Sequence, residues 1–146
     1  MGLNSAALRR DNQNLVVFRG DALRIRVPVT DLDGNPVDVS GAENVIWMCS
    51  SAVDGTADIT KEYVTGDIQL GGTNEFTVTL TGSDTAALTE TVYWPDYRSA
   101  TENQIDRRSI ESSYYHEARI IRGDGNPYTV VSGRLFVRSS LIEGNN

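Results

Sequence analysis

A strict alternation of apolar and polar side chains runs through the segment "DALRIRVPVTD" and constrains the fold more than any other feature of the chain. Because successive side chains of a β-strand point to opposite faces, this two-residue period predicts a half-buried strand. Pro28 cannot donate a backbone hydrogen bond, so we expect the strand to lie at a sheet edge or to carry a bulge there. The apolar positions are Leu23, Ile25, Val27 and Val29.

Comparable segments recur along the chain between turns rich in glycine, asparagine and aspartate. "ENVIWMCS" is an apolar run with Trp47 as its core anchor, and "NEFTVTLTG" alternates again. "SYYHEARIIR" and "SGRLFVRS" are further strands, joined through "GDGNPYTV". Because short strands without long helices are typical of antiparallel sandwiches and barrels, the sequence predicts an all-β fold. The expected core is Leu23, Ile25, Val27, Val29, Trp47, Phe76, Val78, Leu80, Ala118, Ile120, Leu135 and Val137.

Turn residues predict how these strands are connected. "DLDGNPV" is a tight turn in which Gly34 or Asn35 takes the positive φ that such turns need. "TKEYVTG" and "DIQLGG" are expected to form a small hairpin around Gly66. "SDTAALT" is a helical fragment of about one turn, which Ser83 or Asp84 would cap.

Composition argues against several classes of function. The chain has 146 residues, enough for one domain with its own hydrophobic core. Its net charge of −7 argues against nucleic acid as a partner, because phosphate contacts need a basic surface. No apolar stretch approaches the ~20 residues that span a bilayer, and the opening residues do not resemble a signal peptide. We therefore expect no membrane partner and a protein that folds in a reducing cytoplasm.

Residue types that perform catalysis or bind metals are scarce. His116 lies within the strand "YYHEARI", where a hydrogen-bonded structural role is expected. Cys49 lies in the apolar run "VIWMCS" and is expected to be buried. One histidine and one cysteine give no zinc set, and "DLDGN" (Asp31-x-Asp33-Gly34) lacks the later glutamate of a calcium loop. The sequence therefore predicts no catalytic residue, no metal and no cofactor, and thus a protein that is not an enzyme.

Two Arg-Gly-Asp triplets, at 19–21 and 122–124, suggest an integrin ligand at first sight. Each triplet separates two strand-like segments, where glycine and aspartate are the residue types that a turn requires. We interpret both triplets as turns, since short motifs of this kind often match by accident.

The segment 89–112, "TETVYWPDYRSATENQIDRRSIES", interrupts the rhythm of strands and turns. Loops longer than ~12–15 residues in a compact domain are usually functional or disordered. Aromatic residues and arginine are enriched at interface cores, so the segment is either an interface element or an excursion whose Trp94 folds back over the sandwich. The residues expected to bind a partner are Arg9, Arg10, Trp94, Tyr97, Arg98, Arg107 and Arg108.

Three stretches together resemble a family of structural domains from tailed bacteriophages. They are "VFRGDALRIRVPVTDLDGNPVDVSGAENVIWMC", "FTVTLTGSDTAAL" and "YYHEARIIRGDGNPYTVVSGRLFV", which cover most of residues 16–138. These modules are immunoglobulin-like and are similar to the N-terminal domains of baseplate upper proteins and to head-decoration proteins. In such relatives the "DTAAL" corner leads almost directly to the tyrosine-rich strand, whereas segment 89–112 intervenes here.

The resemblance implies an immunoglobulin-like antiparallel β-sandwich at 14–140, with an N-terminal arm at 1–13 and a C-terminal tail at 141–146. It implies a non-enzymatic virion protein, a capsid decoration or cement subunit that binds the major capsid protein or other virion proteins and forms a homo-oligomer on the particle. The arm and the inserted loop 89–112 would hold the head shell. Because the chain ends soon after the last strand, we expect a free-standing subunit rather than the anchor of a longer fibre.

Two alternatives remain open. One is a tail or baseplate adaptor, which is also structural but occupies the other end of the particle. The other is a carbohydrate-binding module for the host surface, in which Trp94, Tyr97 and Tyr128 would stack on sugar rings. Exposed, coplanar aromatic rings would favour the carbohydrate-binding alternative over the structural ones.

Overall fold

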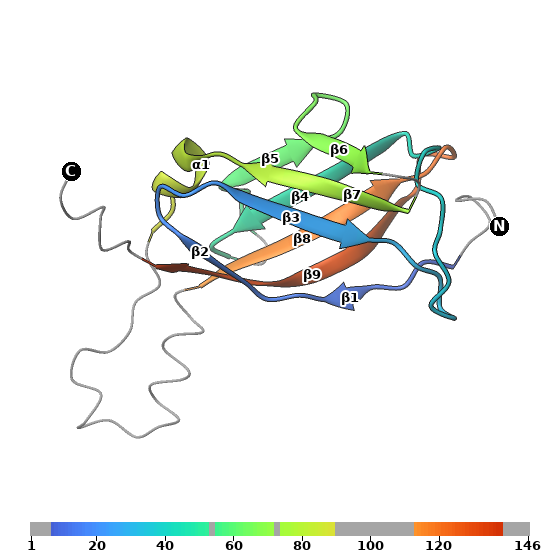
Figure 1. Cartoon of the computed structure of the whole chain (residues 1–146), viewed down its shortest axis with the longest axis horizontal. Coiled ribbons are helices and arrows are strands. Elements are labelled where there is room, and N and C mark those ends of the chain that lie inside the picture. The colour runs from blue at the N-terminus through green and yellow to red at the C-terminus, as the bar shows by residue number, and fades with distance from the viewer. Residues whose placement is uncertain (1–6, 53–54, 72–73, 90–112, 139–146) are drawn as a thin grey trace, which may run out of the picture.

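The structure, a computed structural model, describes residues 7–52, 55–71, 74–89 and 113–138, and within these ranges it is mostly β (Figure 1). Two sheets of six and three strands form a sandwich-like arrangement with one short helix, so the all-β prediction is confirmed. The large sheet contains β1 (Asp11–Asn12), β2 (Leu15–Phe18), β4 (Asn44–Ser50), β5 (Ile59–Glu62), β8 (Tyr114–Ile121) and β9 (Pro127–Arg138). The small sheet contains β3 (Leu23–Pro28), β6 (Ile68–Gly71) and β7 (Glu75–Leu80).

The strand order shows one departure from a purely antiparallel sandwich. The large sheet runs β1-β9-β8-β4-β5, with β2 also beside β9, and the small sheet runs β3-β7-β6. Both β1 and β2 pair with β9 in parallel, from Asp11 opposite Val131 to Phe18 opposite Arg138. The expectation of antiparallel pairing throughout is wrong at this edge. The physical reason is that no hairpin joins these strands, so nothing forces them to run in opposite directions.

The connection around Gly66 is a crossover between the sheets. β5 pairs with β4 in the large sheet, whereas β6 pairs with β7 in the small one, so the predicted β5–β6 hairpin is wrong. The turn itself is present, because Gly66 has a φ of 88° and Asp67 donates its backbone N–H to the carbonyl of Glu62. A turn signal between two short strands does not say whether the second strand returns to the same sheet.

Two other local predictions are confirmed. Pro28 ends β3, which lies at an edge of the small sheet. Gly34 has a φ of 88°, and its turn is fixed by the Asp31 carboxylate, which accepts backbone hydrogen bonds from Asp33 and Asn35 at 2.9 Å. The aspartate of "DLDGN" therefore stabilises an Asx-type turn.

The N-terminal segment is part of the sandwich from residue 7 onward. Arg9 donates its backbone N–H to the carbonyl of Thr30 at 2.9 Å, Leu8 forms a β-bridge with Asp31, and β1 then pairs with β9. The described part of the predicted arm, residues 7–13, is thus hydrogen-bonded to the domain. A two-residue strand leaves no periodicity in the sequence, which is why the segment looked irregular. Residues 1–6, 90–112 and the tail at 141–146 lie outside the described residues.

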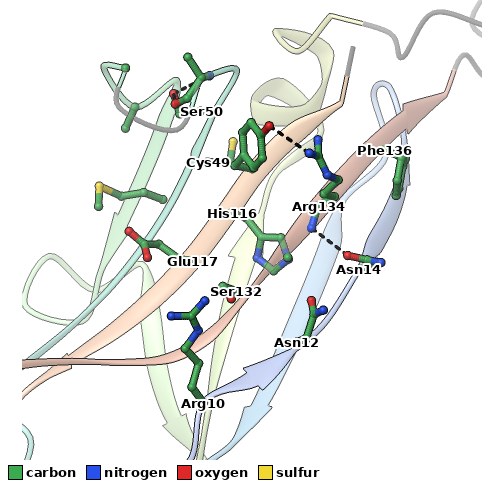
Figure 2. Close-up of a pocket in the computed structure, with 16 residues that line it drawn as sticks. Arg10, Asn12, Asn14, Cys49, Ser50, His116, Glu117, Ser132, Arg134 and Phe136 are labelled. Carbon is green, nitrogen blue, oxygen red and sulfur yellow. Dashed lines mark hydrogen bonds between the residues drawn. The ribbon is translucent and has the colours of Figure 1, made fainter. Parts of the chain in front are cut away.

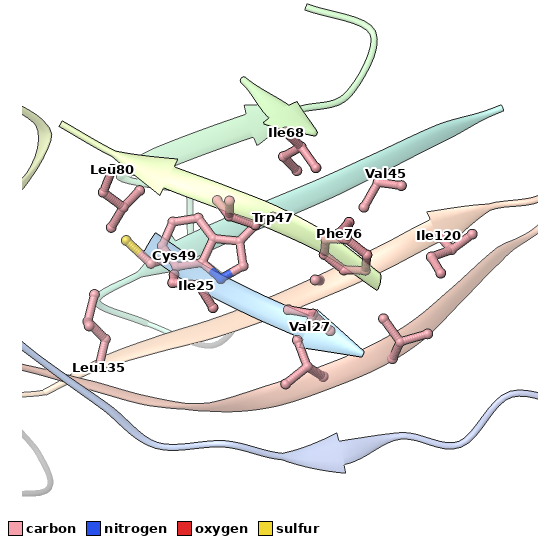
Figure 3. Packing of buried hydrophobic residues seen from close by; sticks show 14 of the residues in the cluster. Ile25, Val27, Val45, Trp47, Cys49, Ile68, Phe76, Leu80, Ile120 and Leu135 are labelled. Atoms are coloured by element: carbon pink, nitrogen blue, oxygen red, sulfur yellow. The ribbon is translucent and has the colours of Figure 1, made fainter. Parts of the chain in front are cut away.

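The core lies between the two sheets and agrees with the sequence analysis. Eleven of the twelve expected residues are buried, and Leu23 is partly buried against the same cluster. Trp47 of β4 and Phe76 of β7 are fully buried and come from opposite sheets (Figure 3). Because such rings bury large apolar areas, these two residues supply a major share of the contact between the layers.

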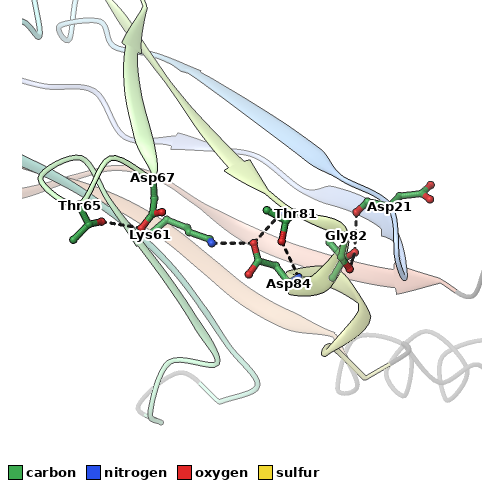
Figure 4. Close-up of polar contacts among 8 residues, drawn as sticks. Asp21, Lys61, Thr65, Asp67, Thr81, Gly82 and Asp84 are labelled. Atoms are coloured by element: carbon green, nitrogen blue, oxygen red, sulfur yellow. Dashed lines mark hydrogen bonds and ion pairs between the residues drawn. The ribbon is translucent and has the colours of Figure 1, made fainter.

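The helix α1 (Gly82–Ala86) forms the corner after β7, and its N-cap lies before both expected residues, Ser83 and Asp84. Thr81 is the N-cap: its hydroxyl accepts the backbone N–H of Asp84, and the Asp84 carboxylate accepts the backbone N–H of Thr81. Asp84 also forms an ion pair with Lys61 of β5, whose Nζ lies 2.9 Å from Oδ2 of Asp84 (Figure 4). The Asp84 carboxylate therefore links the helix start of one sheet to an edge strand of the other.

Replacing Trp47 with alanine should lower the free energy of unfolding by about 3–5 kcal/mol, because a fully buried aromatic ring is removed from the core. Urea unfolding followed by fluorescence and circular dichroism measures this loss. Trp47→Phe serves as the matched variant, since it retains most of the apolar volume and should lose less stability. A loss below about 1 kcal/mol for Trp47→Ala would contradict the central position of this ring.

Candidate functional site

Two of the seven residues expected to bind a partner lie in the described part of the chain. Arg9 is exposed, and its Nε lies 3.2 Å from Oδ1 of Asp11. Arg10 is also exposed and lines a groove on the large sheet. The remaining five lie outside the described residues: Trp94, Tyr97, Arg98, Arg107 and Arg108.

The groove that Arg10 lines lies on the face of the large sheet that is turned away from the core (Figure 2). Its volume is about 680 Å³. Strands β4, β8 and β9 form its floor with their outward side chains, and the N-terminal segment and the connection after β4 form its sides. The outward side chains of the floor include Met48, Tyr115, Glu117, Ser132, Arg134 and Phe136.

One side of the groove carries a row of planar polar side chains. Arg10, Asn12 and Asn14 occupy alternate positions of the N-terminal segment, and all three line the groove. Asn14 is fixed there because its Oδ1 accepts the backbone N–H of Arg134 at 2.9 Å. Sequence reasoning missed this row because it treated residues 1–13 as an arm. All five residues of "RDNQN" are polar, so no apolar–polar alternation in the sequence marks this row.

Arg134 is held in place within the floor. Its Nη1 donates to the Ser113 hydroxyl at 2.9 Å and its Nη2 to the Tyr115 hydroxyl at 3.0 Å. Its guanidinium carbon also lies 4.3 Å from the centroid of the Tyr115 ring. These contacts orient the tyrosine and engage the charge of Arg134 within the domain.

Beneath the groove, a chain of hydrogen bonds crosses the inner face of the large sheet. Nε1 of Trp47 donates to Nδ1 of His116 at 3.2 Å, and Nε2 of His116 lies 2.6 Å from the carbonyl oxygen of Gln13. Because a carbonyl only accepts, Nε2 of His116 carries a proton. Because Nδ1 accepts the indole N–H, it carries none, and the ring is neutral. Burial lowers the pKa of His116, and the hydrogen bond to the Gln13 carbonyl partly opposes that shift. Both ring nitrogens therefore serve structural contacts.

Gly133 of β9 makes this chain possible. It lies opposite His116 in the β8–β9 register, between that strand and the N-terminal segment. A Cβ atom at this position would overlap the carbonyl oxygen of Gln13. Glycine is therefore required for the Gln13 carbonyl to approach the sheet and meet the imidazole.

The sulfur of Cys49 lies in the core, as expected, and is suited to packing rather than nucleophilic chemistry. Burial raises the pKa of its thiol to about 12, and the nearby carboxylates of Asp58 and Asp84 act in the same direction. The thiolate that a cysteine nucleophile needs is therefore scarce at neutral pH.

Both Arg-Gly-Asp triplets are turns, as predicted. In the first, the backbone N–H of Gly20 donates to the Thr85 hydroxyl at 3.0 Å, and that hydroxyl donates to the Asp21 carbonyl at 2.8 Å. The first triplet is thus docked on helix α1 (Figure 4). In the second, the carboxylate of Asp124 accepts the backbone N–H of Asn126 at 2.9 Å.

The two ends of the inserted segment are tied together. The backbone N–H of Thr89, after helix α1, donates to the hydroxyl of Tyr114 at 2.8 Å, and Tyr114 begins strand β8. Tyr114 is buried, so this bond closes the corner within the domain. The corner is therefore held by its own contact across residues 90–112.

Comparison with known proteins gives no match, either to a family model or to a curated protein. Within the described ranges, no group of three or more His, Cys, Asp or Glu side chains is placed to hold a metal ion. In the same part of the chain, no helix is long and apolar enough to cross a membrane.

Acidification should destabilise the protein through His116. Its pKa in the folded state lies below the ordinary value of 6.5, so below about pH 6.5 the unfolded chain binds a proton that the folded state resists. The free energy of unfolding should therefore fall as the pH drops from 7.5 to 5, by at most about 1.4 kcal/mol per pH unit. Urea unfolding at several pH values measures this slope.

The control for this measurement is His116→Gln, whose amide does not titrate and should flatten the slope in this range. NMR titration of the imidazole in the unsubstituted protein gives an independent value. A folded-state pKa at or above 6.5, or an unchanged slope in His116→Gln, would contradict the buried, neutral imidazole.

Gly133→Ala should destabilise the domain by about 1–3 kcal/mol, because the new methyl group displaces the carbonyl of Gln13. Hydrogen exchange should also show faster exchange in β1 and β2. Gly41→Ala is the matched control, since a Cβ at Gly41 has no atom within 4 Å and the residue is exposed. Equal stability of the two variants would show that the close approach at Gly133 is unimportant.

Proposed function

We propose that this chain is a bacteriophage virion structural protein with an immunoglobulin-like fold, a capsid decoration or cement subunit. The strand order supports the fold assignment, because β3-β7-β6 matches the B-E-D sheet and β4, β8 and β9 match strands C, F and G. Trp47 lies on the strand that corresponds to C. Tyr114, whose hydroxyl bonds back across the corner before β8, resembles the tyrosine corner of such domains.

The observation that carries the functional proposal is the bond between Thr89 and Tyr114. It brings the two ends of the corner together at 2.8 Å, so a connection much shorter than residues 90–112 would be enough to join them. A segment of about two dozen residues that is dispensable for connection is best explained by a role in binding, since long loops in compact domains are often functional. Its aromatic and arginine residues are those that interface cores favour.

The use made of the reactive residue types supports a non-enzymatic role. His116 bridges Trp47 and the Gln13 carbonyl through its two ring nitrogens. The thiol of Cys49 is buried, and burial raises its pKa. In this proposal the sandwich is a rigid spacer. The inserted segment, Arg9 and Arg10 bind the major capsid protein or other virion proteins after assembly in the host cytoplasm, and copies form a homo-oligomer on the particle. A tail or baseplate adaptor is the alternative location.

The carbohydrate-binding alternative requires exposed aromatic rings. Tyr128 is 37 % exposed, but the guanidinium carbon of Arg122 lies 3.8 Å from its ring centroid and covers one face. This contact makes Tyr128 a poorer stacking platform on that face. The surface that carries Tyr128 therefore supports the structural role rather than carbohydrate binding.

Replacing residues 90–112 with a short glycine-containing turn should leave the fold intact, because Thr89 and Tyr114 still close the corner. Binding to phage particles stripped of this protein should fall by more than about tenfold in cosedimentation assays, as expected when interface anchors are lost. Circular dichroism and urea unfolding verify the fold. If the shortened variant folds and saturates the particles with unchanged affinity, the segment is not the binding element.

Arg9→Ala and Arg10→Ala test the N-terminal contribution in the same assay. These substitutions are preferable to deletion of 1–13, because deletion would remove β1 and the Gln13 carbonyl that His116 contacts. The control is Gln69→Ala, at an exposed position of β6 on the small sheet.

A further inference from the structure

The groove on the large sheet has the dimensions and rigidity of a ligand site. Its volume of about 680 Å³ lies within the range of roughly 300–1,000 Å³ that is typical of such sites. Its floor is formed by three paired strands, so the ladders of β4, β8 and β9 fix the backbone from which the floor side chains project. A site on paired strands is more precisely positioned than a site on loops.

Several polar groups in the groove are uncommitted. The guanidinium of Arg10, the carboxamide of Asn12 and the hydroxyl of Ser132 make no hydrogen bond to other described residues, and they lie together at one end (Figure 2). Asn12 and Ser132 are also paired in the β1–β9 register, so their side chains are neighbours. Together these groups offer several donors and acceptors within a small area.

Apolar surface lies beside these polar groups. Met48 on β4 and Phe136 on β9 line the same groove and are only partly buried. Tyr115 lies between them on β8, held by Arg134. A ligand that fits this lining must present hydrogen-bonding groups on one side and carbon–hydrogen surface on another.

The charge distribution restricts the ligand further. Glu117 accepts a hydrogen bond from Arg119 at 3.2 Å, and Arg134 is engaged by Ser113 and Tyr115. Arg10 is thus the charge in the lining that has no partner among the described residues. One exposed cation on a chain of net charge −7 does not favour a phosphate or an acidic ligand.

An extended peptide is also a poor fit. Peptides that add a strand bind the unpaired backbone groups of a sheet edge. Here the available groups are side chains on the face of a sheet, and the backbone of β8 is paired on both sides.

We propose that this groove binds a neutral oligosaccharide. Asn12 and Ser132 hydrogen-bond to its hydroxyl groups, and Met48 and Phe136 contact the carbon–hydrogen faces of its rings. The inference does not rest on the virion assignment, and it does not use the aromatic residues of the carbohydrate-binding alternative, Trp94, Tyr97 and Tyr128.

The test is NMR titration of the isotope-labelled full chain with neutral tetrasaccharides built from glucose, mannose, galactose or N-acetylglucosamine. At least one of these probes should produce saturable shifts confined to the groove. Asn12→Ala should weaken its binding by about tenfold or more, because hydrogen bonds to the sugar are lost. Gln69→Ala, on the other sheet, should bind as the unsubstituted protein does.

The Asn12 side chain is exposed and makes no contact that the fold needs, so the variant should remain folded and its spectrum verifies this. Ser132→Ala provides a second variant with the same expected direction. Absence of saturable shifts with every tetrasaccharide, or equal binding by Asn12→Ala and Gln69→Ala, would overturn the proposal. Tighter binding of inorganic phosphate or of an extended peptide to the groove would also overturn it. Particle cosedimentation is a separate measurement, so failure here leaves the virion proposal standing.

Discussion

The hydrogen-bond chain from Trp47 through His116 to Gln13 is the interaction on which the arrangement of the large sheet depends. It begins at the largest residue of the core, crosses β8 and β9, and ends at the break between β1 and β2. The N-terminal segment is therefore held from within the sandwich as well as by its own pairing with β9. Since an unpaired buried indole or imidazole N–H is costly, each member of the chain stabilises the position of the next. The contact requires glycine at position 133, because a Cβ atom there would overlap the carbonyl oxygen of Gln13.

Much of the fold could be predicted from the sequence because burial follows side-chain alternation. The strand 23–29 and the positions of Trp47, His116 and Cys49 on the inner face follow directly from a period of two. Partner choice could not be predicted. The turn at Gly66 leads to the other sheet, and β2 runs parallel to β9, because both depend on contacts between segments far apart in the sequence. Alternation of apolar and polar residues predicts which side chains of a strand face the core, but it does not predict which strand lies beside it.

The candidate sites show the same division. Arg10 was expected to bind a partner, and it does lie in a groove, but its neighbours Asn12 and Ser132 were not anticipated. They come together only when the N-terminal segment pairs with β9, about 120 residues away, and a single sequence carries no mark of that pairing. Conversely, the Arg-Gly-Asp triplets were correctly interpreted as turns, because turn chemistry is local.

The parallel pairing of β2 with β9 has a mechanical consequence. Four consecutive residue pairs, from Leu15 opposite Leu135 to Phe18 opposite Arg138, join the first long strand to the last. A force that pulls β2 from its N-terminal end and β9 from its C-terminal end acts along both strands in opposite directions. All the hydrogen bonds between them are then loaded together in shear, whereas an antiparallel hairpin pulled at its open end breaks them one at a time. The edge of the sandwich that carries the N-terminal segment is thus built to resist tension along the chain.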